Sequence, residues 1–196
     1  MMINHDPEFV ITLQRVIEFI GTFAFALSGI RLAASKHYDW LGGFVCGIAV
    51  AIGGGTIRDV MLGVRPFWML SPIYMICTLF AQCVVIVCHH YLRRLDTTWF
   101  LFDTLGLALF NIAGIQKTLE CGFPFWVAII MGCITGAAGG VIRDVLLNEE
   151  PVIFRKEIYA MACVVGGLTY WLLSWLQVSL YITCLLYTSD AADERS

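Results

Sequence analysis

Residues 53–60 of the chain read GGGTIRDV, which places three consecutive glycines and then a charged pair, Arg58 and Asp59, inside an apolar run. Each glycine lowers helix propensity by about 1 kcal/mol relative to alanine. An ionisable residue at membrane depth is costly and marks a candidate functional site. The pattern returns at residues 139–144, which read GGVIRD. These two stretches guide the interpretation of the whole chain.

The composition is that of an integral membrane protein. Of 196 residues, 59% are hydrophobic and only 14% are charged, whereas soluble domains carry about 25% charged residues. A membrane-spanning helix needs roughly 20 mostly apolar residues. We therefore predict an all-α membrane protein in the lipid bilayer, with helices over residues 10–32, 40–62, 68–91, 99–117, 125–147 and 154–176. The net charge of −3 does not indicate a partner, and the lack of a basic cluster predicts no nucleic-acid partner.

The two glycine stretches belong to an internal repeat. A shift of 85 residues aligns residues 54–62 with residues 139–147, and seven of these nine positions are identical. Each unit has three predicted helices, an odd number of crossings, so the second unit must enter the membrane from the opposite side. We predict two inverted three-helix repeats, residues 10–92 and 97–177. In proteins built this way, the solute path lies between the repeats at broken helices.

The C-terminal residues need a separate interpretation. Residues 184–196 resemble the translation of a sequencing adaptor, and we interpret them as read-through rather than natural sequence. Residues 178–183 are then the start of a truncated seventh transmembrane helix.

Glycines and charges form the candidate solute path. The glycines can break their helices and free backbone carbonyls toward a polar path; the alternative is that they only allow close helix packing. Glu18 and Asp103 align in the repeat and are the candidate partners of the two arginines, either as structural ion pairs or as charges along a path. The full candidate set is Gly53, Gly54, Gly55, Gly139, Gly140, Arg58, Asp59, Arg143, Asp144, Glu18, Asp103 and Asn111.

Other features bear on orientation and chemistry. With the N-terminus outside, most basic residues near helix ends fall on the inner side, so the positive-inside rule predicts an external N-terminus. The chain lacks HExxH, GxSxG and GxxxxGK[ST] motifs. We therefore predict that it is not an enzyme and has no metal site and no cofactor.

The doubled motif GGxIRDVxL, followed each time by a proline (Pro66 and Pro151), resembles bacterial membrane proteins with two glycine-transporter domains. These are similar to the trimeric intracellular cation channels. The resemblance covers about residues 10–178. It implies a bacterial inner-membrane homotrimer of seven-helix protomers, each with its own pore, lined where the glycine motifs break the second and fifth helices. Ala138 departs from a full second glycine triplet.

The resemblance leaves two activities open. The leading one is conduction of monovalent cations such as K⁺, and the other is transport of glycine. A cation path requires carbonyls and acids with the arginines neutralised. A glycine carrier requires a positive group for the carboxylate and an acid for the amine, which Arg58 and Glu18 could supply. A structural membrane subunit, whose glycines only pack helices, is a third and less favoured interpretation.

Overall fold

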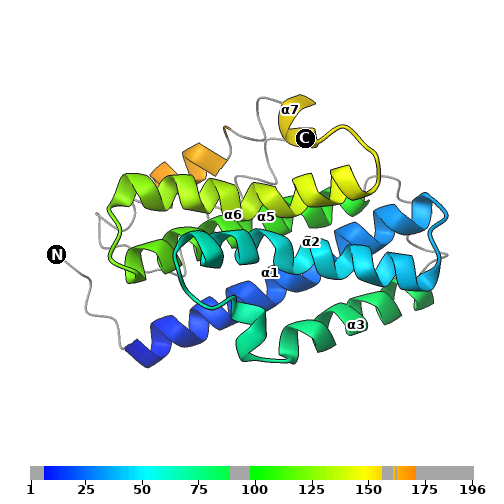
Figure 1. Cartoon of the computed structure of the whole chain (residues 1–196), viewed down its shortest axis with the longest axis horizontal. Helices are drawn as coiled ribbons and strands as arrows, with labels where there is room; N and C mark the ends of the chain where they lie inside the picture. Colours follow the sequence, from blue (N-terminus) through cyan, green and yellow to red (C-terminus); the bar gives the residue numbers. More distant parts are fainter. Residues whose placement is uncertain (1–6, 89–97, 156–160, 162, 171–196) are drawn as a thin grey trace.

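The computed structural model describes residues 7–88, 98–155, 161 and 163–170, and the statements below concern these residues. Within them the secondary structure is helical throughout, as predicted (Figure 1). Residues 163–170 are helical as well. The elements are α1 (Pro7–Ser35), α2 (Trp40–Met61), the 3₁₀ helix η1 (Phe67–Leu70), α3 (Ile73–Val87), α5 (Thr98–Glu120), α6 (Phe125–Leu146) and the single turn α7 (Val152–Arg155).

The helices form one bundle in which sequence-adjacent helices run antiparallel. Helix α1 packs against α2, α3 and α5, while α6 packs against α2 and α5. In Figure 1, α1 and α6 run in one direction, and α2 and α5 run in the other. The two halves of the sequence are therefore joined by α1–α5 and α2–α6 contacts.

The turns that reverse the chain use the same backbone conformations in both halves. His37, after α1, has φ 63°, and Gly122, 85 residues later, has φ 80°. Gly63, after α2, has φ 70°, and Asn148, at the matching position after α6, has φ 53°. Glycine and asparagine adopt these left-handed conformations more readily than other residues. The sequence repeat is thus matched by a repeat of local structure.

The third predicted helix, residues 68–91, is the least accurate of the helix predictions. Residues 67–70 form η1, and α3 begins only at Ile73. Ser71 is extended, with φ −153° and ψ 132°, because the proline that follows it disfavours the helical conformation at the preceding residue. Pro72 is the N-cap residue of α3.

Three helices in the described part are long and apolar enough to cross a membrane: Gln14–Ser35, Trp40–Met61 and Phe125–Leu146. Helix α3 has 15 residues, and α5 carries Asp103, Lys117 and Glu120. About half of the predicted helix at 154–176, namely residues 156–160, 162 and 171–176, falls outside the described residues. So do residues 178–183, predicted to start a seventh helix, and the tail 184–196.

The glycine stretches do not interrupt their helices. Helix α2 runs without a break through Gly53–Gly55, and α6 runs through Gly139 and Gly140. The prediction that these helices are broken at the glycines is therefore wrong. The packing of α2 and α6 against each other and against their neighbours outweighs the propensity cost of the glycines, since tertiary packing supplies most helix stability in proteins.

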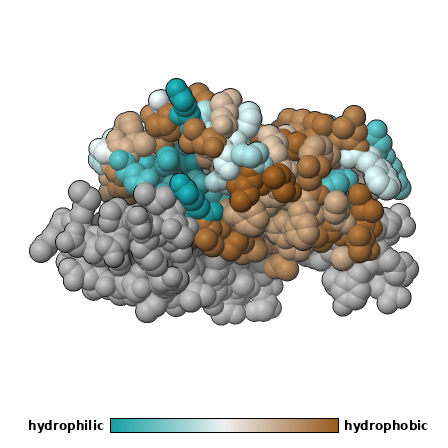
Figure 2. Space-filling model, turned by 90° about the horizontal axis from the view of Figure 1, so that it is seen from below, coloured by the Kyte–Doolittle hydropathy of each residue, from teal (hydrophilic) through white to brown (hydrophobic). Residues whose placement is uncertain are grey.

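Much of the described surface is apolar, as expected for a protein surrounded by lipid. Large hydrophobic side chains are exposed on several helices, with Trp40 73% and Val87 82% exposed. Figure 2 shows apolar residues covering a continuous part of one face. Soluble monomers rarely expose apolar patches of more than a few hundred Å². A bilayer would cover such a surface.

Candidate functional site

Two clusters of buried charges lie inside the bundle. The first, called the Arg58 cluster, consists of Arg58, Asp59, Glu18 and Tyr74. Arg58 Nε donates to Asp59 Oδ1 at 2.7 Å, and Arg58 Nη2 lies 3.3 Å from Glu18 Oε1. The Tyr74 hydroxyl donates to the other Glu18 oxygen at 3.2 Å. Arg58 and Asp59 are both 0% exposed, so helices α1, α2 and α3 meet around charges that are shielded from solvent.

The second, called the Arg143 cluster, consists of Arg143, Asp144, Asp103 and Ser28. Arg143 Nε donates to Asp144 Oδ1 at 2.8 Å, and its Nη1 lies 2.6 Å from Asp103 Oδ1. The same Nη1 donates to the Ser28 hydroxyl at 2.8 Å. Arg143 and Asp103 are 0% exposed. This cluster joins α5 and α6 to α1.

The two clusters share one design, including their backbone contacts. Asp59 Oδ2 accepts a hydrogen bond from the Phe67 N–H at 2.8 Å, and Asp144 Oδ2 accepts one from the Val152 N–H at 3.1 Å. Phe67 and Val152 are matching positions of the repeat. Each aspartate therefore holds the arginine before it with one oxygen and fixes the start of the next helix with the other.

Each cluster, as defined by these residues, carries more negative than positive charge. The Arg58 cluster has one guanidinium against the carboxylates of Glu18 and Asp59, and the Arg143 cluster has one against Asp103 and Asp144. Removing charges from water costs several kcal/mol per ion even after relaxation. Counted as ionised groups, each cluster holds one carboxylate in excess.

The structure places the predicted charged residues as follows. The arginines do meet the acids of the same repeat, Arg58 with Glu18 and Arg143 with Asp103, as the sequence suggested. However, each arginine also pairs with the aspartate next to it in sequence, which we did not expect because adjacent helical residues point in different directions. The pairing is possible because each pair sits in the last turn of its helix, and the long arginine side chain bends back toward its neighbour.

The glycines of α2 lie where this helix meets its neighbours. A Cβ on Gly54 would overlap the backbone carbonyl of Thr135 on α6, and one on Gly139 would come within 3.0 Å of the Val50 carbonyl on α2. A Cβ on Gly55 would overlap the Phe67 ring, and one on Gly53 the side chain of Ile142. Gly140 is buried on α6. The glycines therefore let α2 and α6 approach with their backbones nearly in contact.

Asn111 has a different role in the fold. It is fully buried on α5, and its Nδ2 donates to the carbonyl of Cys163 at 2.9 Å. This hydrogen bond ties α5 to the helical residues 163–170. Within the described residues, no group of three or more His, Cys, Asp or Glu side chains is placed to hold a metal ion.

Two members of the clusters are not among the site residues predicted from the sequence. Tyr74 and Ser28 both contribute hydroxyls. Tyr74 could have been found, because it aligns with Tyr159 in the repeat. Ser28 aligns with Ala113, so the repeat gives no signal for it. Its contact with Arg143 depends on how α1 packs against the second half.

The family model described as "Glycine transporter" matches the chain twice, over residues 15–90 and 100–175. The chain belongs to this glycine transporter family. The doubled match covers both halves of the repeat that carries the buried charge clusters.

Relatives of this family member are membrane proteins. The UPF0126 inner membrane protein YadS of Escherichia coli K12 is 41% identical over 157 residues, which span 79% of this chain and 75% of that protein. The UPF0126 membrane protein YvgT of Bacillus subtilis is 34% identical over 174 residues, spanning 88% and 86%. Together with the apolar helices, these relatives identify the chain as a membrane protein.

The fold is that of solved cation channels. The TRIC trimeric intracellular cation channel orthologue from Rhodobacter sphaeroides superposes with a TM-score of 0.82 at 29% identity, covering 92% of this chain and 93% of that one. A chain from a study of conductance through TRIC cation channels superposes with a TM-score of 0.75 at 31% identity, covering 90% and 88%. Together with the family match, these structures show a membrane transport or channel protein.

Proposed function

We propose that the chain conducts monovalent cations, K⁺ among them, along a path within each protomer that passes the Arg58 and Arg143 clusters. The observation that carries the proposal is the excess carboxylate in each cluster. A buried cluster with two carboxylates and one guanidinium favours cations over anions, and sites lined by one sign of charge raise the local counter-ion concentration. The likeness to TRIC cation channels supports the same choice.

The clusters also provide a physical way to keep the arginines from blocking cations. Both guanidiniums are held by carboxylates on two sides. Their positive charge is thereby neutralised locally, and the remaining charge is negative. The candidate path residues of the clusters are Glu18, Arg58, Asp59, Asp103, Arg143 and Asp144, and the glycines of α2 and α6 set the spacing between the two helices that carry four of them.

A second candidate function is the transport of glycine. One observation favours it: within the described part of the chain, Arg58 Nη1 is buried and has no hydrogen-bond partner. A substrate carboxylate at Nη1 and a substrate ammonium at Glu18 would satisfy both groups. The family's name points the same way. This function requires saturable binding at the Arg58 cluster, whereas ion conduction does not.

Several further features belong to the proposal. The antiparallel course of α1 against α5, and of α2 against α6, supports two inverted three-helix repeats, residues 10–92 and 97–177. We assign the chain to the bacterial inner membrane with its N-terminus in the periplasm, as a homotrimer. The TRIC likeness and the inner-membrane relative support the assembly and the location.

The experiment is parallel flux in proteoliposomes. Purified full-length protein is reconstituted, and K⁺ efflux and labelled glycine uptake are measured on the same vesicles. We expect K⁺ flux that rises linearly with concentration, with no saturable glycine uptake. Saturable glycine uptake without K⁺ flux would show that the protein is a glycine carrier and not a cation channel. Absence of both fluxes would favour the structural subunit.

A further inference from the structure

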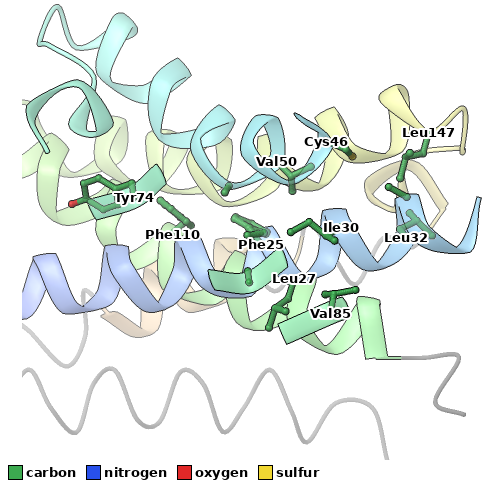
Figure 3. Packing of buried hydrophobic residues seen from close by; sticks show 14 of the residues in the cluster. Phe25, Leu27, Ile30, Leu32, Cys46, Val50, Tyr74, Val85, Phe110 and Leu147 are labelled. Carbon is green, nitrogen blue, oxygen red and sulfur yellow. The ribbon is translucent and has the colours of Figure 1, made fainter. Parts of the chain in front are cut away.

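A stacked pair of phenylalanines lies at the centre of the bundle. The rings of Phe25 on α1 and Phe110 on α5 have centroids 5.3 Å apart and an interplanar angle of 15°. Both residues are 1% exposed. They occupy matching positions of the repeat, 85 residues apart. Figure 3 shows them next to one another within the buried core, between Tyr74 on one side and Ile30 and Leu32 on the other.

The pair lies between the two charge clusters. Phe25 follows Glu18 by seven residues on α1, and Phe110 follows Asp103 by seven on α5, which is about 10 Å along each helix. Ser28, the α1 member of the Arg143 cluster, lies only one turn beyond Phe25. A line along α1 from the Arg58 cluster to the Arg143 cluster therefore passes the two stacked rings.

Aromatic contacts connect the pair to the Arg58 cluster. The Arg58 guanidinium carbon lies 5.8 Å from the centroid of the Phe67 ring, and this ring lies 6.2 Å from that of Phe110. Phe67 also meets Tyr74 edge-on at 4.6 Å. An ion that left the Arg58 cluster toward the other cluster would therefore pass the rings of Phe67 and Phe110.

Glycines from both halves hold the rings in place. A Cβ on Gly21 would come within 3.0 Å of the Phe110 ring, and one on Gly106 within 2.5 Å of the Phe25 ring. A Cβ on Gly139 would lie 3.0 Å from the Phe25 ring on its other edge. Two of these glycines, Gly21 and Gly106, are again matching positions. The lack of a side chain at Gly21 makes room for the Phe110 ring, and the lack of one at Gly106 makes room for the Phe25 ring.

We propose that the Phe25–Phe110 pair is the apolar barrier that keeps the cation path closed in this conformation. The inference rests on the proposed function and names the residues that limit the cation flux. Hydrophobic constrictions block ions because they exclude the water that an ion needs around it. Here the barrier separates two sites that each attract a cation. Conduction requires the two rings to separate or rotate.

The test measures K⁺ flux of the full-length chain in proteoliposomes. The double variant Phe25→Ala/Phe110→Ala removes both rings. We expect its flux to exceed that of the wild type by about tenfold or more, the change produced when a barrier falls by about 1.4 kcal/mol. The matched control is Phe23→Ala on the same helix, because Phe23 stacks on Phe80 at 5.8 Å and is only partly buried. We expect the control to match the wild type.

A second variant covers the case in which the double alanine variant does not fold. Phe110→Tyr keeps the ring and adds one hydroxyl at the barrier. A barrier that works by excluding water predicts a higher K⁺ flux for this variant. A pair that only fills the core predicts a flux equal to or below that of the wild type, and this result in folded protein overturns the proposal.

The outcomes separate the barrier from the proposed function. If the wild type and the folded ring variants conduct K⁺ equally, the proposed barrier is wrong and the proposed channel function is supported. If the wild type is silent and the ring variants conduct, both are supported. If neither the wild type nor any folded variant passes K⁺, both are overturned.

Discussion

Replacing Arg143 by glutamine tests the energetic role of the buried clusters. The substitution leaves Asp103 and Asp144, which are 0% and 2% exposed, without the guanidinium that contacts both. Breaking a buried ion pair by removing one partner costs about 3–5 kcal/mol, because the remaining charge is buried without compensation. Two buried carboxylates lose their guanidinium here, so we expect the loss to fall in the upper part of this range.

The matched comparison is Asp103→Asn. This variant keeps the contacts between Arg143 and Asp144, and the asparagine oxygen can still accept from the guanidinium. The cluster then contains one positive and one negative charge, so we expect a loss of about 1–2 kcal/mol, the value of a hydrogen bond weakened from charged to neutral. The charge count therefore predicts that removing the arginine is far more damaging than removing one acid.

The assay is reversible unfolding in mixed detergent micelles, followed by far-UV circular dichroism, for the wild type and both variants at neutral pH. The difference between the two variants is the decisive quantity. If Arg143→Gln and Asp103→Asn are destabilised equally, or if Arg143→Gln unfolds within about 1 kcal/mol of the wild type, the excess negative charge does not govern the cluster.

Three smaller predictions use the same assay. Gly54→Ala should cost about 1–3 kcal/mol of stability through overpacking against the α6 backbone. Gly43→Ala on the same helix should be neutral or stabilise by up to about 1 kcal/mol, because its Cβ would lie 3.8 Å from the nearest side chain. Equal effects of the two substitutions would contradict the close crossing of α2 and α6. Tyr74→Phe should cost about 1.5 kcal/mol of stability, because it removes a hydrogen bond to the Glu18 carboxylate. No measurable loss would show that this hydrogen bond does not stabilise the protein. Lys36→Gln, which breaks an exposed ion pair with Glu149, should cost less than about 1 kcal/mol, and a larger loss would give this surface pair an unexpected structural role.

The sequence was a good guide to the helices and to the pairing of charges. Apolar length predicted α1, α2 and α6 closely, and the alignment of Glu18 with Asp103 identified the acids that meet the arginines. Both signals are local or follow from the repeat. The break predicted at Gly53–Gly55 did not occur, because glycine propensity describes an isolated helix, whereas here the missing side chains are replaced by the neighbouring backbone of α6.

Contacts between the two halves were much harder to predict. The bond from Arg143 to Ser28 joins residues far apart in sequence, and Ser28 has no polar counterpart in the other repeat. The stacking of Phe25 on Phe110 was also not predicted, although the two phenylalanines align. Alignment reveals equivalent positions, but only the packing of α1 against α5 brings those positions together.

In the proposed cation path, the second carboxylate of each cluster attracts the cations that cross the protein. The most direct measurement is the K⁺ flux of the double variant Glu18→Gln/Asp103→Asn in proteoliposomes, compared with that of the wild type at equal protein density. Each cluster of the variant has one positive and one negative charge. We predict a fall in flux of about tenfold or more, because the local attraction for cations is lost. A folded double variant that conducts K⁺ as well as the wild type would contradict the claim.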